Sequence, residues 1–344
     1  MNNHNYAYTP ADFKSDQEVK WCPGCGNHAI LNSVLKAFPE VAAELKYTHE
    51  RFTIVSGIGC SSRFPYYAKT FGFHGIHGRA TAIATGVKVA NPKLTVWQVT
   101  GDGDALAIGG NHLIHAVRRN IDINILLFNN EIYGLTKGQY SPTSKLGKVT
   151  KTSPFGTVEH PFNPGELVLG ARGTFFARSV DMELELSKAC MVAAAKHDGT
   201  SVVEILQNCV IFNDKTFGDF ALNRETREEH TIVLRHGEKM VFGKNRDKGL
   251  VQIGMKLMVA RIGEGGVTID DILTHNAHEP NPGVHMMLVN MSYPNYPVAL
   301  GVIRDVPDKT YDDNVRDQVE EVRKQAPIAS VDELLRSGDT WEVK

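Results

Sequence analysis

The stretch LTVWQVTGDGD, residues 94–104, is an apolar run that ends in alternating glycines and aspartates. Residues 94–100 predict a buried strand, because the run is short, largely apolar and closed by glycine. Beyond Asp104, apolar residues recur at the spacing of one helix face, at Leu106, Leu113, Ile114 and Val117. The Gly-Asp-Gly segment is therefore predicted to lie at the turn between a strand and the N-terminus of a helix.

This turn has the chemistry of a phosphate and cation site. Gly101 and Gly103 let the backbone approach a phosphate closely, and the free amides of the helix N-terminus face it. The carboxylate of Asp102 can bind a cation that bridges phosphate oxygens. Gly-Asp-Gly alone is only a turn, so the prediction needs a second set of ligands.

The second set follows another predicted strand, residues 122–128, which ends in Asn129-Asn130. Twenty-four residues separate the Gly-Asp-Gly-Asp run from Asn129. The amide oxygen of Asn130, the carbonyl of Ile132 and the diphosphate itself would fill most of an octahedral Mg²⁺ shell. The two segments together predict a Mg²⁺-diphosphate site.

This pairing of motifs resembles the signature of thiamine diphosphate enzymes. Residues 131–139, EIYGLTKGQ, and residues 21–26, WCPGCG, resemble the β subunit of 2-oxoacid:ferredoxin oxidoreductases, and the resemblance runs from about residue 15 to 225. It implies thiamine diphosphate and Mg²⁺ as cofactors. The positions it places around thiamine diphosphate are Cys60, His77, Gly78, Gly101, Asp102, Gly103, Asp104, Asn130, Ile132, Gly134 and Leu135.

The composition is that of a folded chain without a strong charge bias. Thirty-seven basic and 39 acidic residues leave a formal net charge of −2 across 344 residues, which gives no reason to expect a nucleic-acid or membrane partner. No apolar run reaches the roughly 20 residues of a membrane-spanning helix, and the polar start lacks the apolar region of a signal peptide. We therefore expect a cytoplasmic protein.

The order of elements predicts an α/β fold with a doubly wound, mostly parallel sheet, and the resemblance implies that it is of the pyrophosphate-binding type. The expected strands are residues 51–56, 94–99, 123–128, 175–180 and 201–206, with helices starting near residues 26, 77, 104 and 182. The motifs fall at carboxyl ends of strands, where such sheets bind ligands. We expect a cofactor domain over residues 1–210 and, over 211–344, a C-terminal extension that packs on the core or on a partner. Residues 231–241 are read as a hairpin, and residues 140–170 as a functional loop over the site.

Four of the five cysteines are candidate metal ligands. Cys22 and Cys25 lie in a Pro/Gly loop, and Cys60 and Cys209 follow predicted strands, whereas Cys190 has helical spacing and is expected in the core. By chemistry alone, four thiolates suit structural zinc or an iron-sulfur cluster. The resemblance implies that Cys22, Cys25, Cys60 and Cys209 hold one [4Fe-4S] cluster.

Three side chains are candidates for catalysis or substrate binding. His77 lies in a segment that resembles the His-Gly-Arg segment of the family, where an imidazole can bind a substrate carboxylate or assist proton transfer. Arg63 and Lys137 follow different strands and could pair with a second carboxylate, although each could also be a solvated loop residue. The form LTKGQ, residues 135–139, resembles family members that accept 2-oxoglutarate.

The resemblance implies oxidative decarboxylation of a 2-oxoacid, most directly 2-oxoglutarate, with coenzyme A as co-substrate and acyl-CoA and CO₂ as products. The reverse, carboxylating direction is chemically equally allowed. It also implies an α or fused γα partner that supplies the pyrimidine-binding domain, ferredoxin as electron acceptor, and a heterodimer or dimer of heterodimers. Two alternatives stay open: the same reaction on pyruvate, branched or aromatic 2-oxoacids, and a non-catalytic, zinc-stabilised binding subunit.

Overall fold

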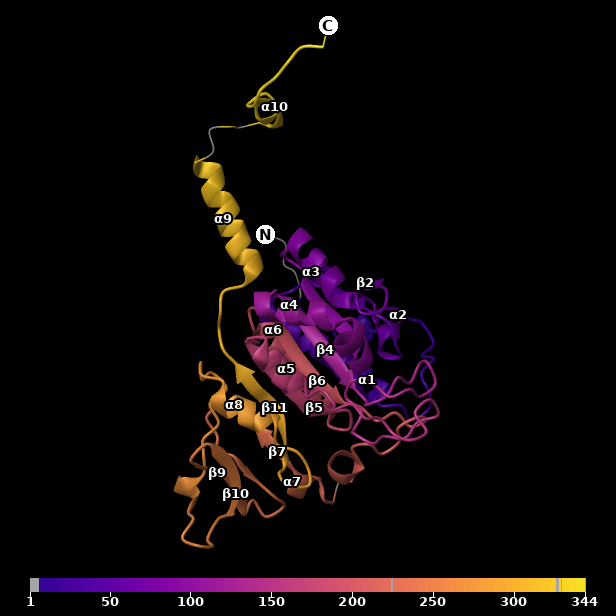
Figure 1. The fold of residues 1–344 in the computed structure, drawn as a ribbon, viewed down its shortest axis with the longest axis vertical. Coiled ribbons are helices and arrows are strands. Elements are labelled where there is room, and N and C mark those ends of the chain that lie inside the picture. The colour runs from indigo at the N-terminus through magenta and orange to yellow at the C-terminus, as the bar shows by residue number, and fades with distance from the viewer. Residues whose placement is uncertain (1–5, 224, 326–327, 329, 344) are drawn as a thin grey trace.

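A computed structural model describes residues 6–223, 225–325, 328 and 330–343. Its centre is an eight-stranded sheet with the order β2-β1-β3-β4-β6-β5-β11-β7 (Figure 1). Neighbouring strands from β2 to β5 pair in parallel, β11 is antiparallel to β5, and β7 is parallel to β11. The strands are β1 Phe52–Ser56, β2 Phe71–His74, β3 Thr95–Gly101, β4 Asn124–Asn129, β5 Phe175–Val180, β6 Ser201–Leu206, β7 Thr231–Leu234 and β11 Val298–Asp305.

Helices cover both faces of this sheet. On one face, α1 (Asn27–Leu45) and α6 (Leu184–Lys196) pack over Trp97, Leu126 and Phe175. On the other face, α3 (Ala80–Ala90), α4 (Gly110–Arg119), α5 (Pro164–Gly170) and α8 (Gly283–Val289) pack over Val96, Ile125 and Phe176. Successive side chains of a strand point to opposite faces of the sheet, and helices cover both faces. Both sets of side chains are therefore buried, which explains why the strands are continuous apolar runs in the sequence.

The prediction of a doubly wound, mostly parallel sheet is confirmed. All five expected strands form, and two of them, β5 and β6, have the predicted bounds. Helix starts differ by a few residues: α3 begins at Ala80 rather than near residue 77. A π-helical turn, Asp104–Ile108, precedes α4, so the regular helix after the Gly-Asp-Gly segment begins only at Gly110.

The C-terminal residues supply two strands of the main sheet, β7 and β11, in addition to a separate antiparallel sheet. That sheet consists of β8 (Val241–Phe242), β9 (Lys248–Ile253) and β10 (Lys256–Arg261). The hairpin predicted over residues 231–241 is wrong, because β7 pairs with β11 and β8 pairs with β9. The division at residue 210 stays a prediction.

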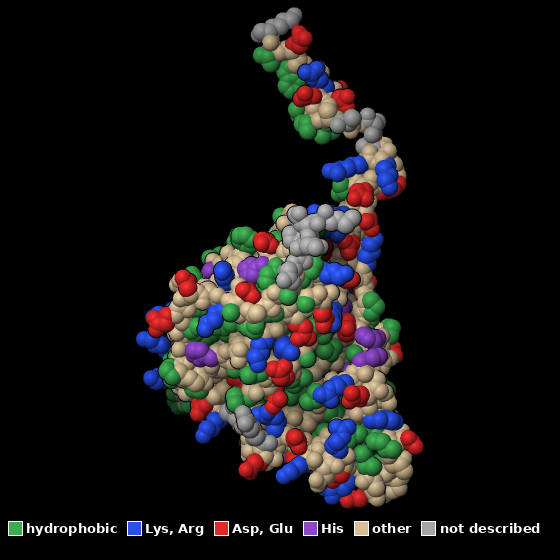
Figure 2. All heavy atoms as spheres, turned by 180° about the vertical axis from the view of Figure 1, so that it is seen from behind, with side chains coloured by type: hydrophobic (Ala, Val, Ile, Leu, Met, Phe, Trp, Pro, Cys, Tyr) green, Lys and Arg blue, Asp and Glu red, His purple; other side chains and the backbone are tan. Residues whose placement is uncertain are grey.

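Two C-terminal helices, α9 (Tyr311–Gln325) and α10 (Val331–Leu335), extend away from the body of the molecule (Figure 1). Acidic and basic side chains are interspersed over the face in Figure 2, consistent with the small net charge. In the described residues, no helix has both the length and the apolar character needed to cross a membrane.

Candidate active site

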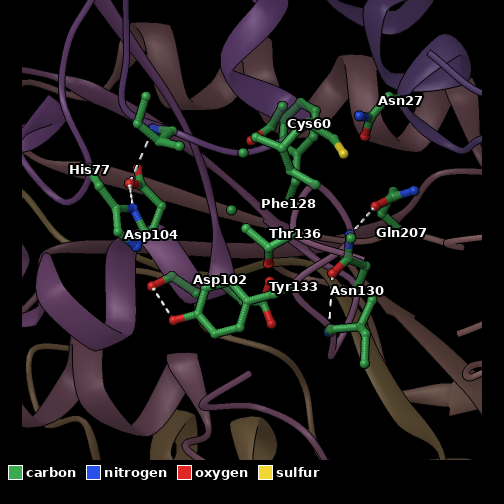
Figure 3. Close-up of a pocket in the computed structure, with 18 residues that line it drawn as sticks. Asn27, Cys60, His77, Asp102, Asp104, Phe128, Asn130, Tyr133, Thr136 and Gln207 are labelled. Atoms are coloured by element: carbon green, nitrogen blue, oxygen red, sulfur yellow. Dashed lines mark hydrogen bonds and ion pairs between the residues drawn. The ribbon is translucent and has the colours of Figure 1, made fainter. Parts of the chain in front are cut away.

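A cavity opens at the carboxyl ends of β1, β3 and β4 (Figure 3). Its wall consists of the segments that follow these strands, residues 58–61, 101–104 and 130–136 apart from Glu131, together with Asn27, His77, Phe128 and Gln207. Parallel strands bring their carboxyl ends to one edge of the sheet, which is where such folds bind ligands. The structure therefore joins the two predicted halves of the Mg²⁺-diphosphate site in one cavity.

Asp102 is the buried carboxylate of this cavity, with 2% of its surface exposed. Its Oδ2 accepts hydrogen bonds from Ser141 Oγ at 2.5 Å and from Thr143 Oγ1 at 2.6 Å. Burial raises the pKa of Asp102, because the charged form loses solvation, although both hydroxyls lower it. A divalent cation at this carboxylate would offset the loss of solvation, so the donor set fits Mg²⁺.

Asn130 and Ile132 line the same cavity. The side chain of Asn130 is oriented from both ends: its Oδ1 accepts from the Ile132 amide at 3.2 Å, and its Nδ2 donates to Gln207 Oε1 at 2.8 Å. Ile132 is buried at the start of the loop that closes the cavity. The amide oxygen that the sequence nominated as a ligand is thus held in a defined position.

Asp104 connects four groups around the cavity. Its Oδ1 is 2.7 Å from His77 Nδ1 and accepts hydrogen bonds from the amides of Gly78 at 2.7 Å and Ile58 at 3.2 Å. Its Oδ2 accepts from Thr100 Oγ1 at 2.8 Å. With Nδ1 facing a carboxylate, the other ring nitrogen of His77 is left for a ligand or for proton transfer.

Glycine is required at two positions beside the cavity. A Cβ on Gly103 would lie 2.1 Å from Tyr133 Cε1, and Tyr133 donates a hydrogen bond to the Gly103 carbonyl at 3.0 Å. Gly78 has a φ of 69°, and a Cβ there would lie 2.5 Å from Ile108 Cγ2. By contrast, a Cβ on Gly101 would meet its nearest neighbour, Ser61 Oγ, at an ordinary 3.7 Å.

Two polar atoms in the cavity wall have no partner among the described residues. The Oδ1 of Asn27, at the start of α1, and the Oγ of Ser61, after β1, are both buried and unbonded. Buried polar groups without partners are costly, because they lose water without replacing it. These atoms are therefore available to a bound polar group, which supports the fit of a cofactor.

Of the four candidate ligand cysteines, Cys60 lines this cavity and Cys209 lies beside it, and Cys22 and Cys25 interact with them electrostatically. A Cβ on Gly134 would be 3.5 Å from Cys209 Sγ and 3.7 Å from Cys60 Sγ. Burial, with a smaller contribution from the charges of Cys209, Cys60 and Cys22, raises the pKa of Cys25 to about 12. Burial also raises the pKa of Cys60 to about 11.

No group of three or more His, Cys, Asp or Glu side chains in the described part of the chain is arranged to hold a metal ion as it stands. The four thiols nevertheless have the chemistry of metal or cluster ligands, since bound metal keeps thiols deprotonated. Cys190 differs from them: it lies on α6 and is 1% exposed in the core, as the sequence predicted.

The two predicted substrate cations are not in the same cavity. Arg63 lines a second cavity with Lys20 and His74, and this cavity shares Ile58, Gly59 and Leu135 with the first. Lys137 is exposed, on the loop that supplies Leu135 to both cavities, but it lines neither of them.

Several residues of the site are absent from the sequence prediction. Ser141 and Thr143 bond Asp102 from a loop about forty positions away, and Asn27, Tyr133 and Gln207 line the cavity. The Ser/Thr/Pro/Gly-rich composition of residues 140–170 was the signal for the first two, since it marked a functional loop. The other three carry no local signal.

The comparisons with known proteins agree with this geometry. Residues 57–205 match the family described as thiamine pyrophosphate enzyme, C-terminal TPP binding domain. The chain is 52% identical over 335 residues to the 2-oxoglutarate oxidoreductase subunit KorB of Mycobacterium tuberculosis, covering 96% of this chain and 88% of that one. It is 42% identical to subunit beta of 2-oxoacid:ferredoxin oxidoreductase 1 from Aeropyrum pernix, over 62% of this chain and 66% of that one.

A solved structure also matches nearly the whole chain. The 2-oxoglutarate:ferredoxin oxidoreductase of Magnetococcus marinus, solved with 2-oxoglutarate, coenzyme A and succinyl-CoA bound, superposes with a TM-score of 0.74 at 30% identity. The match covers 98% of this chain and 96% of that one. Together with the cavity at the ends of β1, β3 and β4, these relatives show that the chain belongs to the family of 2-oxoacid:ferredoxin oxidoreductase β subunits.

Proposed function

We propose that this chain is the subunit that binds thiamine diphosphate, Mg²⁺ and one [4Fe-4S] cluster in an enzyme that converts 2-oxoglutarate and coenzyme A to succinyl-CoA and CO₂. Ferredoxin receives the electrons. The observation that carries the proposal is the adjacency of the two candidate sites, because Cys60 belongs both to the cavity wall and to the group of four cysteines. Bound thiamine diphosphate would supply the electrons, and an iron-sulfur cluster beside it would carry them one at a time. This arrangement suits an oxidation that passes its electrons to ferredoxin.

The residues of this chain divide the work of holding the cofactor. Asp102, Asn130 and the carbonyl of Ile132 would bind Mg²⁺, and the backbone of residues 101–104 would receive the diphosphate. Thiamine diphosphate supplies the carbon nucleophile and the electron sink for decarboxylation when it is bound. Asp104 holds His77 with one ring nitrogen directed away from the carboxylate, so that it can exchange a proton beside the substrate.

Arg63 and Lys137 are proposed to select a substrate with a second carboxylate. The cavity lined by Arg63 adjoins the cofactor cavity, so a substrate extending from one to the other would meet a guanidinium. Lys137 would have to move inward with its loop to make a similar contact. The names of the relatives from Mycobacterium tuberculosis and Magnetococcus marinus include 2-oxoglutarate, which supports the same substrate here.

The proposed complex includes an α or fused γα subunit that supplies the pyrimidine-binding side of the cofactor site. The name of the relative from Aeropyrum pernix identifies it as a beta subunit, which supports a partner for this chain. We propose that the complex is a heterodimer or a dimer of heterodimers.

The experiment is anaerobic coexpression of this chain with its partner subunit, followed by reduction of a low-potential viologen with coenzyme A and a panel of 2-oxoacids. We expect the highest kcat/KM with 2-oxoglutarate. A preference for pyruvate or for branched or aromatic acids would support the proposed reaction but contradict 2-oxoglutarate as its substrate. A colourless protein that contains zinc and reduces nothing would support the alternative of a binding subunit.

A further inference from the structure

We propose that Thr143 is a positioning residue for the Asp102 carboxylate, and that a buried relay of Asn129, Glu204 and Arg178 holds Thr143 in place. The inference rests on the proposed Mg²⁺ site and deepens it, because it assigns roles to residues behind the ligands. None of these four residues is among the ligands that the sequence predicted.

The relay begins at one oxygen of Asp102. Ser141 Oγ and Thr143 Oγ1 both bond Oδ2, at 2.5 and 2.6 Å. Among the described residues, no side chain bonds Oδ1. Two donors on one oxygen fix the rotation of the carboxylate and leave the other oxygen for a cation. Carboxylates that bind metals are commonly held in this way by hydrogen bonds from behind.

Thr143 has a second partner on its far side. Its Oγ1 is 2.9 Å from Asn129 Oδ1, and both residues are 4% exposed. A hydroxyl has one hydrogen, so Thr143 donates to Asp102 Oδ2 or to Asn129 Oδ1, or shares the hydrogen between these two acceptors. Because the site is shielded from water, this contact determines where the hydroxyl lies when it faces Asp102.

The orientation of Asn129 is set in turn by Glu204. Asn129 Nδ2 donates to Glu204 Oε1 at 2.8 Å, which directs the amide oxygen of Asn129 toward Thr143. The other oxygen of Glu204, Oε2, accepts from Arg178 Nε at 2.6 Å. The ion pair is buried, with Glu204 1% and Arg178 5% exposed.

The strand register explains why these side chains meet. Arg178 on β5 lies opposite Glu204 on β6, and Glu204 lies opposite Leu127 on β4. Asn129 is two residues beyond Leu127, so its side chain is on the same face of the sheet. A buried ion pair contributes little net stability compared with apolar residues of similar volume. We infer that the function of the Arg178–Glu204 pair is to orient Asn129.

The test compares Thr143→Val, which keeps the shape and removes the hydroxyl, with Thr143→Ser, which keeps the hydroxyl. The measurement is the Kd of Mg²⁺ for the complete complex at saturating thiamine diphosphate, by calorimetry, with Tm as a check of folding. We expect Thr143→Val to raise the Kd by about 10- to 100-fold and Thr143→Ser to stay within about threefold of the wild type.

Thr157→Val is the matched control, because Thr157 is a buried threonine on the same loop and its hydroxyl bonds only the Glu159 amide among the contacts of the described residues. Its Kd should not change. An unchanged Kd in Thr143→Val, or an equal loss in Thr143→Ser or Thr157→Val, would overturn the role of Thr143.

The relay is tested by replacing both members of the ion pair at once, Arg178→Met with Glu204→Leu, so that no lone charge is left buried. A folded double variant should bind Mg²⁺ about tenfold more weakly, and a wild-type Kd would overturn the relay. If this variant does not fold, Asn129→Leu interrupts the relay at its centre and is judged by the same Kd.

Asp102→Ala separates this inference from the proposed function. If Asp102→Ala retains thiamine diphosphate and Mg²⁺ at wild-type stoichiometry, the site itself is misplaced. If it loses both while Thr143→Val binds Mg²⁺ normally, only the positioning role is rejected.

Discussion

At the scale of single residues, Asp104 links the loops that form the cavity. Two backbone amides, an imidazole and a hydroxyl all bond its carboxylate. Asp104→Asn preserves the side-chain shape and one oxygen acceptor but removes the charge that faces His77. We expect kcat to fall by about 10- to 100-fold, as for other residues that orient a functional histidine, with little loss of bound cofactor.

The measurement is kcat on 2-oxoglutarate together with the thiamine diphosphate content of the purified complex. His77→Asn serves as the comparison. If Asp104 acts through His77, adding Asp104→Asn to His77→Asn should lower kcat little further. A multiplicative loss in the double variant would show that Asp104 has a separate role.

The cysteines give a second prediction. Cys209 lies beside Cys60 at the cavity edge, whereas Cys190 is enclosed in the core, where burial raises the pKa of its thiol to about 12. Cys209→Ala should therefore lose iron and acid-labile sulfide or hold them weakly, while Cys190→Ala should keep both. Iron and sulfide analysis of the anaerobically purified variants is the measurement. The opposite result would exchange the roles of the two residues.

Arg63 and Lys137 give a third prediction, which concerns substrate choice. A charged hydrogen bond to a second carboxylate contributes on the order of 1.5 to 3 kcal/mol, or about 10- to 100-fold in kcat/KM. Arg63→Ala and Lys137→Ala should each lower the efficiency on 2-oxoglutarate by up to that factor and leave pyruvate nearly unchanged.

The structure suggests the larger effect for Arg63, because it lines the adjoining cavity while Lys137 is exposed. Equal losses on both acids would place the side chain at the carboxylate that the two substrates share. If kcat/KM on both acids is unchanged in both variants, Arg63 and Lys137 are solvated loop residues.

At the scale of elements, local pattern was sufficient for the inner strands and insufficient for the outer ones. β5 and β6 are buried on both faces, so their apolar runs could be read directly. β7 was misread because its partner is β11, more than sixty residues along the chain, and register with a distant strand leaves no local mark. β2 was missed because all four of its residues are exposed.

The same limit applies to the site. The positions of Asp102 and Asn130 at strand ends could be predicted, because a parallel sheet brings those ends to one edge. The bonds from Ser141 and Thr143 could not, since the path of a long loop depends on contacts that composition does not specify. The sequence marked the loop as functional without identifying the two hydroxyls.

The place of β11 in the main sheet leads to a fourth prediction. Ile303 on β11 is fully buried in the core cluster beneath α8. Ile303→Ala should lower the free energy of unfolding by roughly 2 to 5 kcal/mol, because it removes buried surface and leaves a cavity. Val319→Ala on the exposed α9 should change it by no more than about 0.5 kcal/mol. Thermal unfolding of the two variants measures the difference, and equal Tm values would contradict the packing of β11.

At the scale of the whole molecule, the proposed cofactor cavity is assembled from residues that lie as far apart in the sequence as Asn27 and Gln207. Asn27 at the start of α1 and Gln207 after β6 line the same cavity as the loops after β1, β3 and β4. The proposed diphosphate and Mg²⁺ sites and the Cys60 thiol all belong to this cavity. The match to a thiamine pyrophosphate-binding domain covers one region of the chain, residues 57–205.

The last prediction follows from that single region. If the pyrimidine-binding side of the cofactor site belongs to another subunit, this chain alone should not reduce viologen with any 2-oxoacid, even when its iron content is complete. Addition of the partner should restore turnover, and the rate should saturate as the partner approaches equimolar amounts. Asp102→Ala mixed with the same partner is the control, because a complex without the Mg²⁺ ligand should form and remain inactive. Turnover by the isolated chain would show that it contains a complete active site, and the assignment of half of that site to a partner would have to be abandoned.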